Sequence, residues 1–160
     1  MELPMAAGPG ESITILMAED DDIHAALIER MLHKAGLQNP ILRFRDGQEI
    51  LEFLAQVDRG SGQEQGRPYL LLLDIYMPRV DGVEVLRELK ADPVLKHIPV
   101  IMLTTADDPH EVQHCYALGC NLFITKPSGL DQFMETLKTL VLLIRVLSVA
   151  PLGRELPAEG

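Results

Sequence analysis

The sequence is poor in cysteine, aromatic residues and basic residues, and these shortages exclude several classes of protein. Two cysteines in 160 residues, Cys115 and Cys120, are too few for a disulfide scaffold, and no second ligand pair stands near them to form a zinc site. The 14 basic and 24 acidic residues give a net charge of −10. That charge disfavours nucleic acid and anionic membranes as partners, because both are bound through Lys and Arg. Because so few cysteines argue against disulfides, we expect a protein of the reducing cytoplasm.

The chain also has no apolar run long enough to cross a bilayer, which takes about 20 residues. The longest late run, residues 140–150, is short and contains Arg145. No basic segment precedes an apolar one at the N-terminus, so no signal peptide is predicted. Hydrophobic residues still make up 47% of the chain, which is enough for the core of one folded domain.

Strand-like and helix-like segments alternate along the chain. Continuous apolar runs without polar alternation are typical of strands buried on both faces, as in a parallel sheet with helices on both sides. The pattern predicts one α/β domain over residues 13–150, after a flexible arm (1–12) and before a short tail (151–160), with a polar loop over residues 58–68. The expected strands are 13–17, 41–44, 69–73, 100–103 and 122–124, and the expected helices are 23–35, 46–57, 83–89, 108–118 and 130–149.

On the first and last helices, the spacing of apolar residues predicts which face is buried. The first helix carries a stripe of four residues at intervals of four, and the last helix carries a stripe with mixed intervals of four and three. The first stripe is Ile23, Leu27, Met31 and Ala35; the second is Phe133, Leu137, Leu140 and Ile144.

Acidic residues follow two of the predicted strands at the point where each strand ends. Glu19 and Asp20 come after the first strand, and Asp74 comes after the most apolar one. Parallel strands end at one edge of a sheet, so these carboxylates should share a pocket there. Their mutual repulsion would be relieved by a divalent cation, and Mg²⁺ prefers such oxygen ligands. The backbone carbonyl of Tyr76 could add a further ligand.

Two other residues at strand ends suit phosphoryl chemistry. A carboxylate beside Mg²⁺ can act as a nucleophile and form an acyl phosphate. The transferred group then needs positive charge and a hydroxyl donor. Lys126 and Thr104 each close a later strand and could supply these groups beside Asp74.

These residues together resemble a bacterial response-regulator receiver domain over residues 13–138. The matching features are Glu19-Asp20, Asp74 with the following segment 77–82 (MPRVDG), Thr104, and Lys126-Pro127. The resemblance implies a flavodoxin-like (βα)5 fold with a five-stranded parallel sheet in the order 2-1-3-4-5. It also implies a signalling phosphoacceptor rather than an enzyme, with Mg²⁺-dependent self-phosphorylation and autodephosphorylation as its only reactions.

The same resemblance implies a role for each residue. Asp74 resembles the phosphoacceptor, Glu19 and Asp20 the metal-binding acids, and Lys126 the lysine that reaches the phosphoryl group. Thr104 resembles the switch hydroxyl, and Phe123 stands where the family has its switch aromatic residue. The Lys126–Pro127 bond resembles one that the family holds in the cis form.

The loop over residues 56–68 is long and the segment 103–109 (LTTADDP) is distinctive, and both are similar to those of single-domain regulators that partner phytochrome-type histidine kinases. This similarity suggests a kinase such as a bacteriophytochrome as the phosphoryl donor. Two other interpretations stay open. A Mg²⁺-dependent phosphatase with an Asp nucleophile would commonly need a second Asp where Tyr76 stands. A receiver that serves only for dimer contacts would not need the complete set of site residues.

The last predicted helix is apolar on more than the face that its stripe would bury. Met134, Val141, Leu142, Leu143, Val146, Leu147 and Val149 place apolar groups on its other faces. A helix that is apolar all round needs cover on more than one side. We expect a homodimer, with Leu142, Leu143, Val146 and Val149 at its interface. Similar receiver domains dimerise through the fourth helix, fifth strand and fifth helix; a docking surface for a kinase or output protein is the alternative.

Overall fold

The computed structural model describes residues 13–58 and 68–147. Within these two ranges, five strands alternate with five α-helices, and one turn of 3₁₀-helix precedes the fourth strand. The strands are β1 (Thr14–Ala18), β2 (Ile41–Phe44), β3 (Tyr69–Leu73), β4 (Val100–Thr104) and β5 (Leu122–Thr125). The helices are α1 (Asp22–Lys34), α2 (Gly47–Asp58), α3 (Gly82–Ala91), the 3₁₀ turn η2 (Leu95–His97), α4 (Pro109–Leu118) and α5 (Leu130–Val146).

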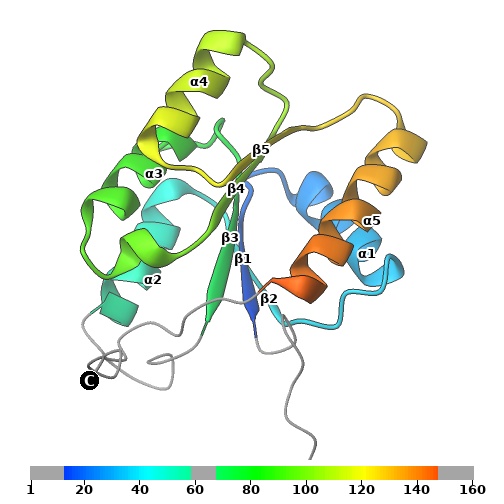
Figure 1. The fold of residues 1–160 in the computed structure, drawn as a ribbon, viewed down its shortest axis with the longest axis horizontal. Coiled ribbons are helices and arrows are strands. Elements are labelled where there is room, and N and C mark those ends of the chain that lie inside the picture. The colour runs from blue at the N-terminus through cyan, green and yellow to red at the C-terminus, as the bar shows by residue number, and fades with distance from the viewer. Residues whose placement is uncertain (1–12, 59–67, 148–160) are drawn as a thin grey trace, which may run out of the picture.

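All neighbouring strands pair in parallel, in the order β2-β1-β3-β4-β5, which confirms the predicted flavodoxin-like topology. Helices α1 and α5 cover one face of the sheet, and α2, α3 and α4 cover the other (Figure 1). Because every strand runs the same way, the carboxyl ends of β1, β3, β4 and β5 lie along one edge. This edge is where open α/β sheets bind their ligands.

Each face of the sheet has its own apolar core. Alternate residues of a strand point to opposite faces, so Leu71 and Leu73 join the cluster under α2, α3 and α4, while Leu70 and Leu72 join the cluster under α1 and α5. All five residues of β1, β3 and β4 are buried. The continuous apolar runs of the sequence are therefore strands covered on both sides, as expected.

The predicted elements agree with the structure to within a few residues, with three exceptions. The stripe expected on α1 is wrong at its first residue, because Ile23 is 78% exposed. Met31 is buried as predicted and Leu27 and Ala35 are partly buried, but the helix also buries Ala25, Ile28 and Leu32, which the stripe leaves out. The 3₁₀ turn was not predicted. On α5 the stripe of Phe133, Leu137, Leu140 and Ile144 is buried as predicted, but Val141, expected on another face, is buried with it.

The arm (1–12), the tail (151–160), Val149 and most of the polar loop lie outside the described residues, so these predictions stay untested. Among the described helices, none has the length and apolar character needed to cross a membrane.

Candidate functional site

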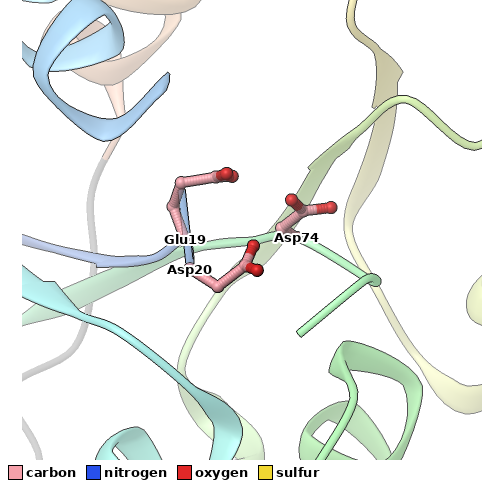
Figure 2. A group of neighbouring side chains, drawn as sticks. All are labelled: Glu19, Asp20 and Asp74. Atoms are coloured by element: carbon pink, nitrogen blue, oxygen red, sulfur yellow. The ribbon is translucent and has the colours of Figure 1, made fainter. Parts of the chain in front are cut away.

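Three carboxylates from two strand ends meet at the carboxyl edge of the sheet. Ala18 of β1 pairs with Leu73 of β3, so the residues that follow them leave the sheet side by side. The Asp74 N–H continues the ladder by donating to the Ala18 carbonyl at 3.1 Å. One carboxylate oxygen from each of Glu19, Asp20 and Asp74 lies within 4.8 Å of the others, and the side chains converge on one space (Figure 2). The three carboxylates that the sequence analysis expects at this edge therefore form one cluster.

The three acids of this cluster differ in their exposure to solvent. Glu19 is 2% exposed and Asp74 is 7% exposed, whereas Asp20 is open to solvent. Burial, together with a hydrogen bond to Asp74, raises the pKa of Glu19 from 4.5 to about 7, although Lys126 acts in the opposite direction. The effect of burial on this pKa is thus larger than the opposing effect of the Lys126 ammonium group.

Lys126, which follows β5, contacts two of the three acids. Its Nζ lies 2.9 Å from Glu19 Oε2 and 3.6 Å from Asp74 Oδ2, and its side chain is nearly buried. Its backbone N–H donates to the Thr104 carbonyl at 2.7 Å, which joins the ends of β4 and β5. A buried cation is thus held against two of the carboxylates. One expectation fails here: the structure has no cis peptide bond among its described residues, so the Lys126–Pro127 bond is trans, the isomer that X–Pro bonds intrinsically prefer.

Thr104 is the last residue of β4, as the sequence analysis expects, and Phe123 lies within β5. Thr104 is fully buried, and its hydroxyl accepts a 3.4 Å hydrogen bond from the Ala106 N–H. Phe123 is half-buried against the core beneath α2, α3 and α4. Its N–H donates to the Tyr116 hydroxyl at 3.0 Å, which ties edge strand β5 to α4.

The segment after Asp74 is shaped by two close contacts. A Cβ at Gly82 would lie 2.1 Å from the Asp74 carbonyl oxygen, so only glycine allows α3 to begin this close to the acidic pocket. The Tyr76 N–H donates to Asp74 Oδ1 at 3.4 Å, while its hydroxyl donates to Glu111 of α4 at 3.5 Å. Tyr76 therefore connects the Asp74 loop with α4, a contact that sequence reasoning missed.

The donor set suits a hard divalent cation. Its side-chain ligands are all carboxylate oxygens, they lie close enough together to share one ion, and they carry more negative charge than Lys126 balances. Mg²⁺ and Mn²⁺ both prefer oxygen ligands of this kind. One residue next to this site was not predicted. Arg43, in the middle of β2, donates hydrogen bonds to the backbone carbonyl oxygens of Glu19 and Asp20, and a charged residue within a strand could have indicated it.

A parallel sheet in this order, with acids, a threonine and a lysine at its carboxyl edge, defines a phosphoacceptor protein of flavodoxin-like fold. Residues 15–138 match the family described as the response regulator receiver domain, so the chain belongs to that family of two-component signalling proteins.

Individual relatives narrow the comparison. The chain is 36% identical to the response regulator Rcp1 of Synechocystis over 121 residues, which cover 76% of this chain and 81% of Rcp1. The solved Mn²⁺-bound form of Rcp1 has a TM-score of 0.75 at 31% identity, covering 85% of this chain and 97% of that one.

Two further structures are similar. The phosphorylated cyanobacterial phytochrome response regulator RcpA has a TM-score of 0.70 at 36% identity, with 79% of this chain and 89% of that one covered. A receiver domain from Rhodospirillum rubrum has a TM-score of 0.80 at 40% identity, with 87% and 98% covered. The chain is thus homologous to response regulators of phytochrome signalling.

Proposed function

We propose that Asp74 is the residue whose phosphorylation activates this response regulator. The observation that carries the proposal is the convergence of Lys126 on the Asp74 and Glu19 carboxylates at the end of β3. In the transfer, the bond between phosphorus and a histidine nitrogen of the kinase breaks, and a bond forms between phosphorus and an Asp74 oxygen. The electron pair of the broken bond stays on the histidine ring.

The chain's own residues supply most of what this reaction needs. The strand end holds the Asp74 backbone, and the Tyr76 N–H orients its carboxylate. Lys126 places positive charge 3.6 Å from the nucleophilic carboxylate, where the phosphoryl oxygens arrive. Thr104 provides a hydroxyl one strand away.

A bound Mg²⁺ would be held by Asp20 and Asp74, with Glu19 on a coordinated water and the Tyr76 carbonyl as a further ligand. The ion would offset the repulsion among the acids and the charge of the phosphoryl oxygens. The Mn²⁺-bound form of Rcp1 supports a divalent ion in a homologue, and the choice of Mg²⁺ is our proposal.

Acetyl phosphate with Mg²⁺ tests this assignment, with the intact mass as the readout. We expect the wild-type protein to gain one phosphoryl group and Asp74→Asn to gain none, because Asn keeps the shape but lacks the nucleophilic oxygen. Asp107→Asn, which changes an exposed acid after β4, is the matched control and should be phosphorylated normally. Phosphorylation of Asp74→Asn to the wild-type extent would overturn the proposal. Continuous release of phosphate would instead favour the phosphatase alternative.

The phosphorylated state is read, in our proposal, through Thr104 and Phe123. The Thr104 hydroxyl accepts a long hydrogen bond, 3.4 Å, from the Ala106 N–H, so it can turn to donate to a phosphoryl oxygen. Phe123 is half-buried and could then move into the space that the hydroxyl leaves. Structures with and without beryllofluoride test this idea, and identical side-chain rotamers of both residues in the two states would reject it.

The proposed phosphoryl donor is a histidine kinase of the phytochrome type, on the strength of the similarity to RcpA and Rcp1. Comparing transfer rates from phosphorylated kinases, with a bacteriophytochrome kinase among them, tests this partner. Faster transfer from unrelated kinases would overturn it. The cytoplasmic location, for its part, stays a prediction from the sequence.

We also propose that α5 forms a homodimer interface with β5 and α4. Leu142, Leu143 and Val146 are 61%, 40% and 73% exposed, so these predicted interface residues do present apolar groups at the surface. Leu143 also lines a cavity of about 300 Å³ with Leu122 and Ile124 of β5. A two-fold contact between copies would cover these groups. No nucleic acid or membrane is needed as a partner.

Light scattering on the unphosphorylated protein tests the dimer. We expect twice the mass of one chain, because the apolar groups are exposed without phosphorylation. Leu143→Glu or Val146→Glu should give a monomer, whereas Ile23→Glu, at an apolar residue of α1 that is 78% exposed, should not. A wild-type monomer would refute the dimer and favour a docking surface for another protein.

A further inference from the structure

Arg43 binds the turn that carries the two metal-site acids of β1. This residue lies in β2, and its side chain is only 20% exposed. Its Nε and Nη2 donate to the Glu19 carbonyl oxygen at 3.1 and 2.9 Å, and Nη2 also donates to the Asp20 carbonyl oxygen at 3.2 Å. Its Nη1 donates to Asp22 Oδ1 at 2.6 Å. One guanidinium group thus contacts three of four consecutive residues.

These contacts complete the fixation of the Glu19 backbone. The Glu19 N–H already donates to the Phe44 carbonyl at 3.0 Å, which extends the ladder of β1 and β2 past the end of β1. With Arg43 on its carbonyl oxygen, the residue is held on both sides. The Asp21 side chain then caps α1 by accepting from the Ile23 and His24 N–H groups. The directions in which Glu19 and Asp20 leave the turn, toward Asp74, are thereby set (Figure 2).

The way in which Arg43 binds differs from that of Lys126. Lys126 contacts carboxylate oxygens, which a cation would use, whereas Arg43 contacts the carbonyl oxygens of Glu19 and Asp20. Its ion pair among the described residues is with Asp22, in the first turn of α1. Arg43 can therefore hold the two acids in place and leave their carboxylates free for a metal.

We propose that Arg43 is a positioning residue for the divalent-cation site, which it preorganises by fixing the Glu19-Asp20 backbone. The inference rests on the proposed metal site. Preorganisation and simple charge predict opposite results when this arginine is removed. Loss of a positive charge near the site should by itself strengthen cation binding. Loss of the backbone contacts should weaken it, because the acids must then be ordered against their own repulsion when the metal binds.

Mn²⁺ affinity, measured from the paramagnetic resonance signal of the free ion, separates the two effects. We expect Arg43→Met to raise the Kd about tenfold, as loss of outer-shell partners of metal sites commonly does. The matched control is Arg45→Met. Arg45 lies 3.8 Å from the same Asp22 carboxylate and is 67% exposed, so its removal takes away similar charge. That variant should bind Mn²⁺ as tightly as the wild type or slightly more tightly. Equal or tighter binding by Arg43→Met would overturn the proposal.

Two more measurements separate the possible failures. Arg43→Lys keeps the charge but loses the planar fork, so it should also weaken binding, and it decides the question if Arg43→Met does not fold. Amide exchange over residues 19–22 in the metal-free protein should be faster in the Arg43 variants than in Arg45→Met. If the wild type binds no Mn²⁺, the metal site itself is overturned and this inference with it. If the wild type binds Mn²⁺ and loses it in Asp20→Asn, but the Arg43 variants bind normally, the role of Arg43 alone is refuted.

Discussion

Replacing Glu19 by Gln should stabilise the metal-free protein near neutral pH, although it removes a buried ion pair. Glu19 is 2% exposed, and burial raises its pKa from 4.5 to about 7. A folded-state pKa above the unfolded value means that the folded protein binds this proton more tightly. The resulting stabilisation is complete below the unfolded pKa and is lost as pH rises through about 7. Above that pH, folding must bury an ionised carboxylate beside Asp74.

The size of the effect follows from this pKa change. A rise from 4.5 to about 7, at about 1.4 kcal/mol per unit, corresponds to about 3 kcal/mol as an upper limit. Gln has the shape of the protonated acid and carries no charge, and its carbonyl oxygen can still accept from Lys126. Lys126 also keeps Asp74 as a charged neighbour at 3.6 Å. We therefore expect Glu19→Gln to gain up to about 3 kcal/mol in free energy of unfolding near pH 8.

Urea denaturation with a chelator present measures this difference. The advantage of Glu19→Gln should shrink as the pH falls from about 8 to about 5, because the wild-type carboxyl then takes up its proton. Millimolar Mg²⁺ should also reduce it, because the ion favours the ionised acid. Glu88→Gln, at an exposed position of α3, controls for the general effect of removing one negative charge. A Glu19→Gln variant that is less stable than the wild type near pH 8 would refute this reasoning.

Three further predictions test other parts of the structure. Leu137→Ala, in the buried face of α5, should lower the free energy of unfolding by about 2–5 kcal/mol. Leu142→Ala, at a residue that is 61% exposed, should change this free energy little. Equal losses for the two variants in urea denaturation would contradict the described helix face. Cys115 should resist alkylation in the folded protein, because the thiol is buried and its pKa is raised to about 11; labelling near neutral pH at the rate of the unfolded chain would contradict this. Tyr76→Ala should shorten the lifetime of the phosphorylated protein several-fold by opening Asp74 to water. Tyr76→Phe, which loses only the Glu111 hydrogen bond, should change this lifetime much less. Equal lifetimes for wild type and Tyr76→Ala, measured by intact mass, would show that Tyr76 does not shield Asp74 from water.

The sheet and its edge could be predicted because a parallel sheet has a simple sequence pattern. A strand covered on both faces must be apolar throughout, so β3 is visible as the uninterrupted run Tyr69–Leu73. A polar residue just after such a run must then lie at the carboxyl edge. Glu19 and Asp74 meet this condition, whereas Lys126 follows Thr125 at the end of the partly buried edge strand β5. The structure brings all three side chains together.

Helix faces were predictable only where the spacing follows the helical period. An α-helix has 3.6 residues per turn, so steps of four advance about 40° around the axis each time. Three such steps, from Ile23 to Ala35, turn through about 120° and leave the buried face, and Ile23 is accordingly exposed. On α5, steps of four, three and four from Phe133 to Ile144 stay close to the helical period, and this stripe is buried. Mixed spacing is therefore better evidence for a buried face than a regular interval of four.

Arg43 escaped prediction because its function depends on a neighbouring strand rather than on its own strand's end. An arginine in the middle of the four-residue strand Ile41–Phe44 is nevertheless a signal, since a charged side chain in such a strand needs a partner. The partner is the β1–α1 turn, because β2 lies next to β1 and pairs Arg43 with Met17, two residues before Glu19. Like-charged carboxylates that converge cannot hold each other in place. For Glu19 and Asp20, β2 supplies two of the groups that hold the backbone: the Phe44 carbonyl, which accepts from the Glu19 N–H, and the Arg43 guanidinium, which donates to the two carbonyl oxygens.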